Sequence, residues 1–157
     1  MSERDSWATP RWLTDLLPPV ALDPCSNEQS TVAALYAYHL SRGQDGLALP
    51  WGGSVFVNPP YSNVRPWADK LARSRGVQAA AFLVNVDSST VWWHVLTLRL
   101  PFALLFHKRI QFVAPPGVKS STNSKPQALL MDREFLSQCS TELLATGVLW
   151  RVQEEAA

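Results

Sequence analysis

Apolar residues occur along the chain in short runs separated by segments with helical spacing. The clearest run, Gln78 to Val86, is almost continuously apolar and predicts a strand buried on both faces. Val20 to Leu22, ending at Asp23-Pro24, and Val55 to Val57 predict two shorter strands. Three further strands are predicted at Pro101 to Phe106, Gln127 to Met131 and Thr146 to Val152.

Helices are expected between several of these runs. Positions 32, 35, 36 and 40 are apolar, so the spacing predicts a helix from Asn27 to Ser41 that Arg42-Gly43 ends. Arg65 to Arg75 should form a helix that Pro66 begins and Gly76 ends. Two shorter helical segments are expected at Thr9 to Leu17, before Pro18-Pro19, and at Ser88 to Leu98.

Strands alternating with helices predict an α/β fold, with a central, mainly parallel sheet and flanking helices. The 157 residues fit a single domain. In such sheets, ligands bind beyond the carboxyl ends of the strands. Asp23 and Asn58 each follow a predicted strand, so we expect them to face one crevice.

Composition excludes several classes of protein. A formal net charge of +1 with 17% charged residues leaves no broad basic face, so any nucleic-acid footprint must be local. The two cysteines lie far apart and the three histidines show no metal spacing, which argues against a disulfide framework and a metal site. No run is long enough to span a membrane and no signal peptide is visible, so we expect a cytoplasmic protein.

The segment Asn58-Pro59-Pro60-Tyr61 is an unusual way to end a buried strand. A following proline holds a residue in an extended conformation, and neither proline has an N–H group. The Asn58 amide oxygen and a main-chain carbonyl can therefore form a rigid pair of acceptors for an NH2 group, beside the flat face of Tyr61. An exocyclic amine on a nucleobase fits this pair, whereas the alternative is a proline-rich turn after an edge strand.

These residues match the Asn-Pro-Pro-Tyr motif of amino-group methyltransferases that use S-adenosylmethionine. The order of motifs resembles that of phage DNA N6-adenine methyltransferases of the Dam type, from residue 7 to about residue 130. The resemblance implies an abbreviated Rossmann-like fold and methyl transfer to adenine N6 of a base flipped out of double-stranded DNA. The motifs that carry it are Trp7 to Pro10, Leu22 to Cys25, Asp45 to Leu47, Trp51, Asn58 to Ser62, Trp67 and Lys108 to Phe112.

The resemblance also implies roles for individual residues. Asn58, Pro59, Pro60 and Tyr61 would hold the adenine and carry the catalysis. Thr9-Pro10 would lie over the methionine part of S-adenosylmethionine, and Asp45 would accept from its adenine amine. Further contacts with this cofactor are expected from Trp7, Asp23, Pro24 and Cys25.

The segment Asp23 to Ser30 departs from the common pattern because it lacks the glycines of most cofactor loops. Glu28 is the candidate acid for the ribose hydroxyls. Asp23 could also be a helix N-cap, since Asp-Pro readily begins a helix.

Contact with DNA is expected from the long loop Phe112 to Pro126 and from four nearby cations. These are Lys108, Arg109, Lys119 and Lys125, which could instead form a solvated face. A domain of this size has no room for a large separate recognition module, so the two subunits of a homodimer could recognise the target site together.

Three other functions compete with adenine methylation. Cytosine N4 offers a similar amine, and a protein glutamine offers a planar carboxamide, although the glycine-rich loop and extra helical domain of glutamine methyltransferases are absent. A non-catalytic DNA-binding or decoy protein that keeps the pocket is the alternative from a different class.

Overall fold

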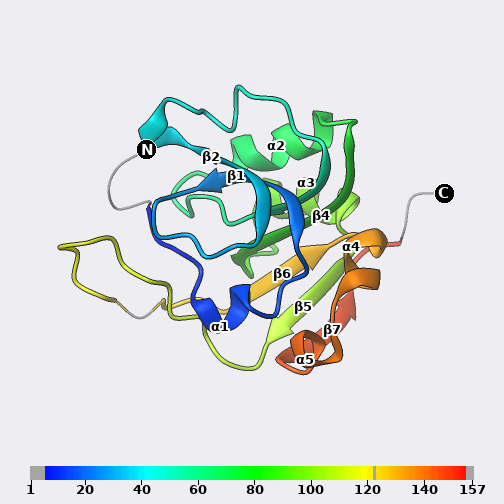
Figure 1. The fold of residues 1–157 in the computed structure, drawn as a ribbon. Helices are drawn as coiled ribbons and strands as arrows, with labels where there is room; N and C mark the ends of the chain where they lie inside the picture. The colour runs from blue at the N-terminus through cyan, green and yellow to red at the C-terminus, as the bar shows by residue number, and fades with distance from the viewer. Residues whose placement is uncertain (1–5, 122, 155–157) are drawn as a thin grey trace.

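The computed structural model describes residues 6–121 and 123–154. Helices and strands alternate through most of this chain (Figure 1). In order they are α1 (Arg11–Thr14), β1 (Val20–Ser26), β2 (Ala34–His39), the 3-10 helix η2 (Leu40–Arg42), β3 (Gly53–Val57), α2 (Arg65–Arg73), β4 (Val77–Asn85), α3 (Val91–Arg99), β5 (Phe102–Phe106), β6 (Gln127–Met131), α4 (Arg133–Gln138), α5 (Thr141–Leu144) and β7 (Gly147–Arg151).

The seven strands form one mixed sheet in the order β2-β1-β3-β4-β6-β5-β7. From β2 to β4, neighbouring strands pair in parallel. Strand β6 runs antiparallel to both β4 and β5, and β7 runs antiparallel to β5. The predicted mainly parallel sheet is therefore confirmed for its first four strands. Because β1 to β5 all point the same way, their carboxyl ends lie along one edge of the sheet.

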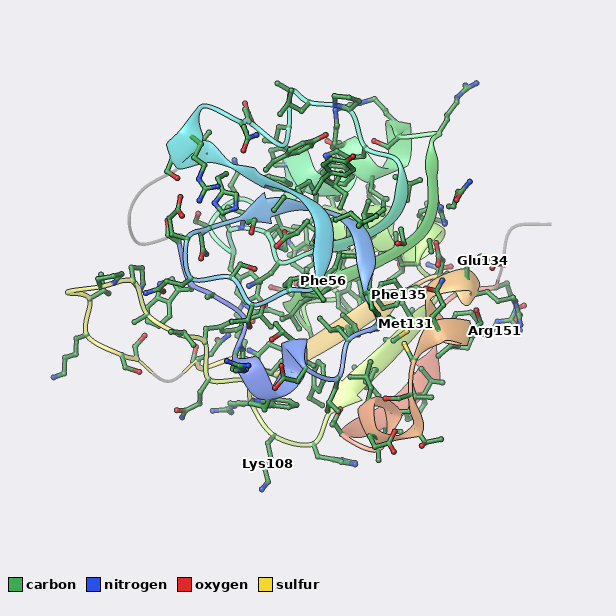
Figure 2. The ribbon with its side chains drawn as sticks, in the orientation of Figure 1. Phe56, Lys108, Met131, Glu134, Phe135 and Arg151 are labelled. Atoms are coloured by element: carbon green, nitrogen blue, oxygen red, sulfur yellow. The ribbon has the colours of Figure 1, made fainter. Side chains whose placement is uncertain are left out.

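Each face of the sheet is covered by helices. Trp67 and Leu71 of α2 and Trp93 and Leu96 of α3 pack in one hydrophobic cluster with residues of the central strands. On the opposite face α1, α4 and α5 pack in a second cluster. Figure 2 shows Phe56, Met131 and Phe135 of that second cluster converging between the sheet and α4, whereas Lys108 points outward. Strand β4 lies between the clusters, and its residues 79–84 are buried, as its apolar sequence predicts.

The helix predicted from Asn27 to Ser41 is wrong. Val20 pairs with Ala34 and Ser26 with His39, so residues 27–33 must return along the whole length of β1. Seven extended residues cover about 23 Å, whereas seven helical residues cover only about 10 Å. The geometry therefore requires an extended return, after which β2 follows at the edge of the sheet.

Two other local expectations differ from the structure. Strand β1 continues through Asp23 and Pro24 to Ser26, so Asp23 lies inside a strand and is not a helix N-cap. The helices α4 and α5 were not predicted. Each is one or two turns long and has an N-cap side chain, Asp132 or Ser140, that accepts a backbone hydrogen bond.

Asp132 connects three elements on the side of the sheet away from the carboxyl ends of β1 to β5. Its Oδ1 accepts from Phe135 N at 2.9 Å, and its Oδ2 accepts from Ala80 N at 3.0 Å and from Arg99 Nη1 at 2.9 Å. The carboxylate is buried, so its removal would leave two buried backbone N–H groups and the Arg99 guanidinium without this acceptor.

We expect Asp132→Ala to lower the free energy of unfolding by about 3 kcal/mol, because two buried N–H groups and a partly exposed guanidinium lose their buried acceptor together with an N-cap. Urea denaturation at constant m-value measures the change. Ser140→Ala removes only the N-cap of α5 and should cost about 1 kcal/mol. Equal losses in the two variants would contradict the special role of Asp132.

Candidate active site

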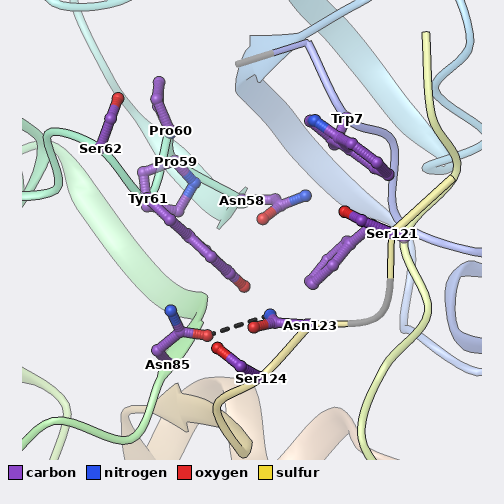
Figure 3. Close-up of a pocket in the computed structure, with 11 residues that line it drawn as sticks. Trp7, Asn58, Pro59, Pro60, Tyr61, Ser62, Asn85, Ser121, Asn123 and Ser124 are labelled. Atoms are coloured by element: carbon purple, nitrogen blue, oxygen red, sulfur yellow. Dashed lines mark hydrogen bonds between the residues drawn. The ribbon is translucent and has the colours of Figure 1, made fainter. Parts of the chain in front are cut away.

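A pocket of about 380 Å³ opens beyond the carboxyl ends of β3 and β4 (Figure 3). It combines a segment near the N-terminus, the turn after β3, the last residue of β4 and the loop before β6. The lining residues are Trp7, Asn58, Pro59, Pro60, Tyr61, Ser62, Asn85, Phe112, Ser121, Asn123 and Ser124.

Asn58 directly follows β3, and its side chain is held by the N-terminal segment. Its Nδ2 donates to Thr9 Oγ1 at 3.2 Å. Thr9 is buried, and the preceding residue, Ala8, pairs with Val113 through two backbone hydrogen bonds of 3.0 and 2.9 Å. With the nitrogen engaged, the Asn58 Oδ1 receives no hydrogen bond from the described residues and is available as an acceptor at the pocket.

The two prolines leave carbonyl groups with few partners, as the sequence suggests. Asn63 N donates to the Pro60 carbonyl at 3.0 Å and closes a turn. Within residues 6–121 and 123–154, no group donates to the Pro59 carbonyl. The turn therefore offers one amide oxygen and one main-chain carbonyl close together in sequence, both acceptors.

Tyr61 is fixed within the pocket wall. Its hydroxyl donates to the Leu83 carbonyl at 3.2 Å, and burial raises the pKa of the phenol well above its usual value, so the group stays neutral. The ring meets Phe112 edge to face, with centroids 5.5 Å apart and planes at 89°. Together with Trp7, these rings give the pocket flat aromatic faces for a planar ligand.

Polar residues opposite Asn58 were not predicted. Asn85 ends β4, and its Oδ1 accepts from Asn123 Nδ2 at 3.2 Å. Ser121 and Ser124 lie on the same loop as Asn123 and also line the pocket. Asn85 could have been found from the sequence, since it is a polar residue at the end of an apolar run, like Asn58.

Three residues predicted to bind the cofactor surround a separate, smaller hollow. Pro24, Cys25 and Asp45 line it, but it measures only about 20 Å³. Gly46 closes this hollow tightly, because a Cβ atom there would lie 1.9 Å from the Pro24 carbonyl oxygen. The side chain of Asp45 is exposed and caps its own turn by accepting from Leu47 N at 2.9 Å.

Asp23, predicted to contact the cofactor, is buried with both oxygens engaged. Oδ1 accepts from Cys25 N and Oδ2 accepts from the Ser30 hydroxyl, each at 3.2 Å. Burial raises the pKa of this carboxyl to about 6, although hydrogen bonds from Ser26, Cys25 and Ser30 oppose the shift. These bonds tie β1 to the extended return that follows it.

The remaining predicted residues are dispersed. Pro10 is buried at the start of α1, next to Thr9. Glu28, the candidate for the ribose hydroxyls, instead binds the Arg42 guanidinium through both oxygens at 3.0 and 2.6 Å. Trp51 and Trp67 stack on each other in the core with centroids 6.1 Å apart.

The four predicted DNA-contacting cations differ in their surroundings. Lys108 and Arg109 are exposed in the turn after β5, at the same edge as the pocket. Lys119 is exposed on the loop and has no carboxylate within ion-pair distance among the described residues. The Lys125 ammonium pairs with Asp87 at 2.9 Å and is thereby already neutralised in part.

Neither a metal cluster nor a membrane span is found in the part of the chain that the structure describes. Residues 6–121 and 123–154 contain no group of three His, Cys, Asp or Glu side chains that could hold a metal ion. None of their helices combines the length and apolarity that crossing a bilayer requires.

A protein-family model described as DNA N-6-adenine-methyltransferase (Dam) matches residues 1–149. The chain belongs to the Dam family. The activity of that family is methylation of adenine N6 in DNA. No curated protein and no solved structure matches the chain.

The region matched by the Dam family contains every residue that lines the pocket as well as all strands except the last residues of β7. Family membership thus agrees with the resemblance drawn from the motifs. The roles of individual residues stay predictions, since they rest on the motif and on the geometry described above.

The raised pKa of Asp23 predicts a pH-dependent stability. The folded state holds the proton up to about pH 6, whereas an unfolded aspartate loses it near its usual pKa of 3.8. The stability should therefore be fully present below about pH 4 and fall by up to about 3 kcal/mol as the pH rises through 6. Asp23→Asn keeps the hydrogen-bonding shape and should remove this fall.

Urea unfolding of both proteins from pH 4 to pH 7.5 measures the effect. Asp23→Asn should match the unsubstituted protein at low pH and exceed its stability above pH 6. Asp45→Asn, which changes an exposed carboxylate, is the control. If the free energy of unfolding changes with pH in the same way for the protein and for Asp23→Asn, the raised pKa assigned to Asp23 is contradicted.

Proposed function

We propose that this Dam-family chain is a one-domain enzyme that transfers a methyl group from S-adenosylmethionine to N6 of an adenine flipped out of double-stranded DNA. The observation that carries this proposal is the turn after β3. There Asn58 and Pro59 line an aromatic pocket, and the Asn58 Oδ1 and the Pro59 carbonyl receive no hydrogen bond within residues 6–121 and 123–154. Two acceptors on one rigid turn complement the two hydrogens of an amine.

The sheet supports a Rossmann-like assignment. Strands β2, β1, β3 and β4 are adjacent and parallel, and the chain order changes direction across β1, between β2 and β3. In open α/β sheets, ligands bind outside the carboxyl ends of the strands near such a change. The return between β1 and β2 is extended and lacks the usual helix, which is why we propose an abbreviated form of the fold.

Acceptors at Asn58 and Pro59 would act on the electrons of the amine. The lone pair of an exocyclic amine is delocalised into the ring, and hydrogen bonds from both of its hydrogens favour a tetrahedral nitrogen with a localised lone pair. S-Adenosylmethionine, when bound, would supply a methyl carbon on a cationic sulfur: the nitrogen–carbon bond would form as the carbon–sulfur bond breaks, the sulfur would leave as a neutral thioether, and the methylated nitrogen would then release a proton to water. As the nitrogen becomes positive, acceptors held in place stabilise it more than they stabilise the neutral substrate.

Aromatic side chains would offset the cost of flipping the base. Unstacking costs a few kcal/mol, and stacking on an aromatic ring returns roughly 1 to 3 kcal/mol. Tyr61 is suited to this role because its hydroxyl is anchored to Leu83 and its ring cannot turn freely. The same ring faces can also stabilise a nearby cation modestly.

The site suits the sulfonium end of S-adenosylmethionine better than its nucleoside end. The pocket of about 380 Å³ is within the usual range for ligand sites, and its aromatic and amide groups suit the sulfonium end. The hollow at Pro24, Cys25 and Asp45 is about 20 Å³, which is room for little more than a water molecule and far too small for a nucleoside. Contact of these three residues with the nucleoside end therefore requires the Leu40 to Pro50 segment to move.

Thr9 and Asp23 are best understood as positioning residues. The Thr9 hydroxyl accepts from the Asn58 amide and holds that side chain in place, and Asp23 holds the start of the return after β1. The cofactor contacts predicted for Trp7 and Pro10 are part of the proposal. A homodimer is also part of the proposal. The proposed location is the cytoplasm, which for a phage-encoded protein is the cytoplasm of the host cell.

Two alternatives are tested by the same assay. Cytosine, like adenine, carries an amine beside a ring nitrogen. Methylation of cytosine N4 would place the label on cytosine. A non-catalytic DNA-binding protein would leave both bases unlabelled and give no heat on titration with the cofactor.

Replacing Asn58 by alanine should lower the rate of methyl transfer at least about 100-fold, which is the usual loss when one group that stabilises transition-state charge is removed. Binding of S-adenosylmethionine, measured by calorimetry, should change little. Transfer of labelled methyl groups to duplex DNA, followed by base analysis, measures the rate and identifies the base.

Asn63→Ala is the matched control, because this exposed amide lies in the same turn and contributes only its backbone N–H to the structure. It should keep nearly full activity. An active Asn58→Ala enzyme would remove Asn58 from the mechanism, and an unsubstituted protein that labels no adenine would contradict the proposed function.

Binding to DNA should depend on Lys119 more than on Lys125. Each lysine–phosphate contact contributes about 0.9 to the slope of log K against log salt concentration. Lys119→Ala should lower this slope by about 1, whereas Lys125→Ala should lower it less because the ammonium is paired with Asp87. Lys70→Ala, on the distant helix α2, is the control, and an unchanged slope in Lys119→Ala would assign that lysine to solvent.

A further inference from the structure

The buried side chain of Gln127, the first residue of β6, is fixed in one orientation. Its Oε1 accepts from the backbone N–H of Ile110 at 2.8 Å. A backbone N–H can only donate, so the amide atom that faces Ile110 must be the oxygen. The Nε2 group therefore points the other way, where it donates to the Lys125 carbonyl and to Asn85 Oδ1, the latter at 3.1 Å.

A second anchored amide reaches Asn85 from the loop before β6. The backbone N–H of Lys125 donates to Asn123 Oδ1 at 3.2 Å, so the other end of the Asn123 amide must be its NH2 group. That group donates to Asn85 Oδ1 at 3.2 Å. Two independent backbone N–H groups thus determine, through Gln127 and Asn123, that the Asn85 atom facing them is an oxygen.

The nitrogen of Asn85 is consequently turned away from Gln127 and Asn123. Figure 3 shows its amide oxygen toward Asn123 and its nitrogen turned away. No group in residues 6–121 or 123–154 accepts from Nδ2, and this nitrogen is not among the buried polar atoms that lack a partner. Since Asn85 lines the pocket, Nδ2 is a donor open to a ligand there.

Asn58 and Asn85 therefore present opposite groups to one space. Asn58, whose nitrogen donates to Thr9, offers an acceptor, and Asn85 offers a donor; the contacts behind Asn85 prevent its amide from turning. A planar ligand that donates from an amine and accepts at an adjacent ring atom satisfies both. An amine next to a ring nitrogen with a free lone pair has this pattern.

We propose that Asn85 is a specificity-determining residue that donates through Nδ2 to the ring nitrogen beside the amine of the flipped base. This inference rests on the proposed function. It assigns the lone pair on the ring as a second recognition element, in addition to the amine held by Asn58. A base that has a C–H or N–H group at that position would leave the donor unpaired.

The test measures single-turnover methyl transfer to duplex oligonucleotides that carry adenine, 1-deazaadenine or 7-deazaadenine at the target. Each analogue replaces by C–H one of the two ring nitrogens that flank the amine. We expect one analogue to be slower than adenine with the unsubstituted enzyme, and this penalty should be about tenfold smaller with Asn85→Ala. Comparing the two enzymes cancels the effect of the analogue on the amine itself.

Asn123→Ala is the control variant. It removes one donor to Asn85 Oδ1 but leaves Gln127, so the orientation of Asn85 and the full penalty should persist. If each analogue shows the same penalty with the unsubstituted enzyme as with Asn85→Ala, the inference is overturned while adenine methylation stays intact. A loss of cofactor affinity in Asn85→Ala without any change in the penalties would also overturn it, since the donor would then serve the cofactor.

Discussion

The parallel pairing of β3 with β4 is the constraint on which the pocket depends. Val57 lies beside Phe82, so Asn58 leaves the sheet next to the last residues of β4. Because both strands point the same way, the turn after β3 and the end of β4 open at one edge. Asn58 and Asn85 thus reach a common space from the backbone of two adjacent strands in the middle of the sheet.

The change to antiparallel pairing at β6 adds the second half of the site. Asn85 lies directly opposite Gln127 in the register of β4 and β6, and this places their amides within hydrogen-bonding distance. A parallel strand at this position would end, not begin, beside Asn85. The antiparallel strand instead brings the loop before β6 to the pocket, with Asn123 close to the strand it precedes.

Prediction from the sequence succeeded where local pattern and tertiary structure agree. The apolar run of β4, Pro66 at the start of α2 and the turn at Asn58 were all visible in the residue order. It failed at residues 27–41, where helical spacing was overridden by the short return that parallel pairing demands. Residues 34–39 then lie in an edge strand, where Leu35 and Tyr36 are exposed and no core selects the alternation typical of a strand.

Half of the pocket could be anticipated because the Asn-Pro-Pro-Tyr segment is contiguous. The other half depends on side chains far apart in sequence, such as Asn85 and Asn123, whose meeting requires the register of β4 and β6. The predicted cofactor residues Pro24 and Asp45 do meet each other, around the small hollow, but they do not reach the main pocket. Spacing along the chain cannot reveal whether a hollow is open.

None of the described side chains that line the pocket is charged, and this bears on how the proposed enzyme would discriminate between bases. A carboxylate in place of Asn58 would attract any nearby cation, with little regard to direction. An amide is selective only if it cannot rotate, because its two ends have opposite hydrogen-bonding character. Gln127 and Asn123 prevent that rotation for Asn85, so the cost of an unpaired group is incurred whenever the wrong pattern meets its amide. Under the proposed function, rigidity of neutral groups, more than attraction between charges, would therefore be the physical source of selectivity between bases.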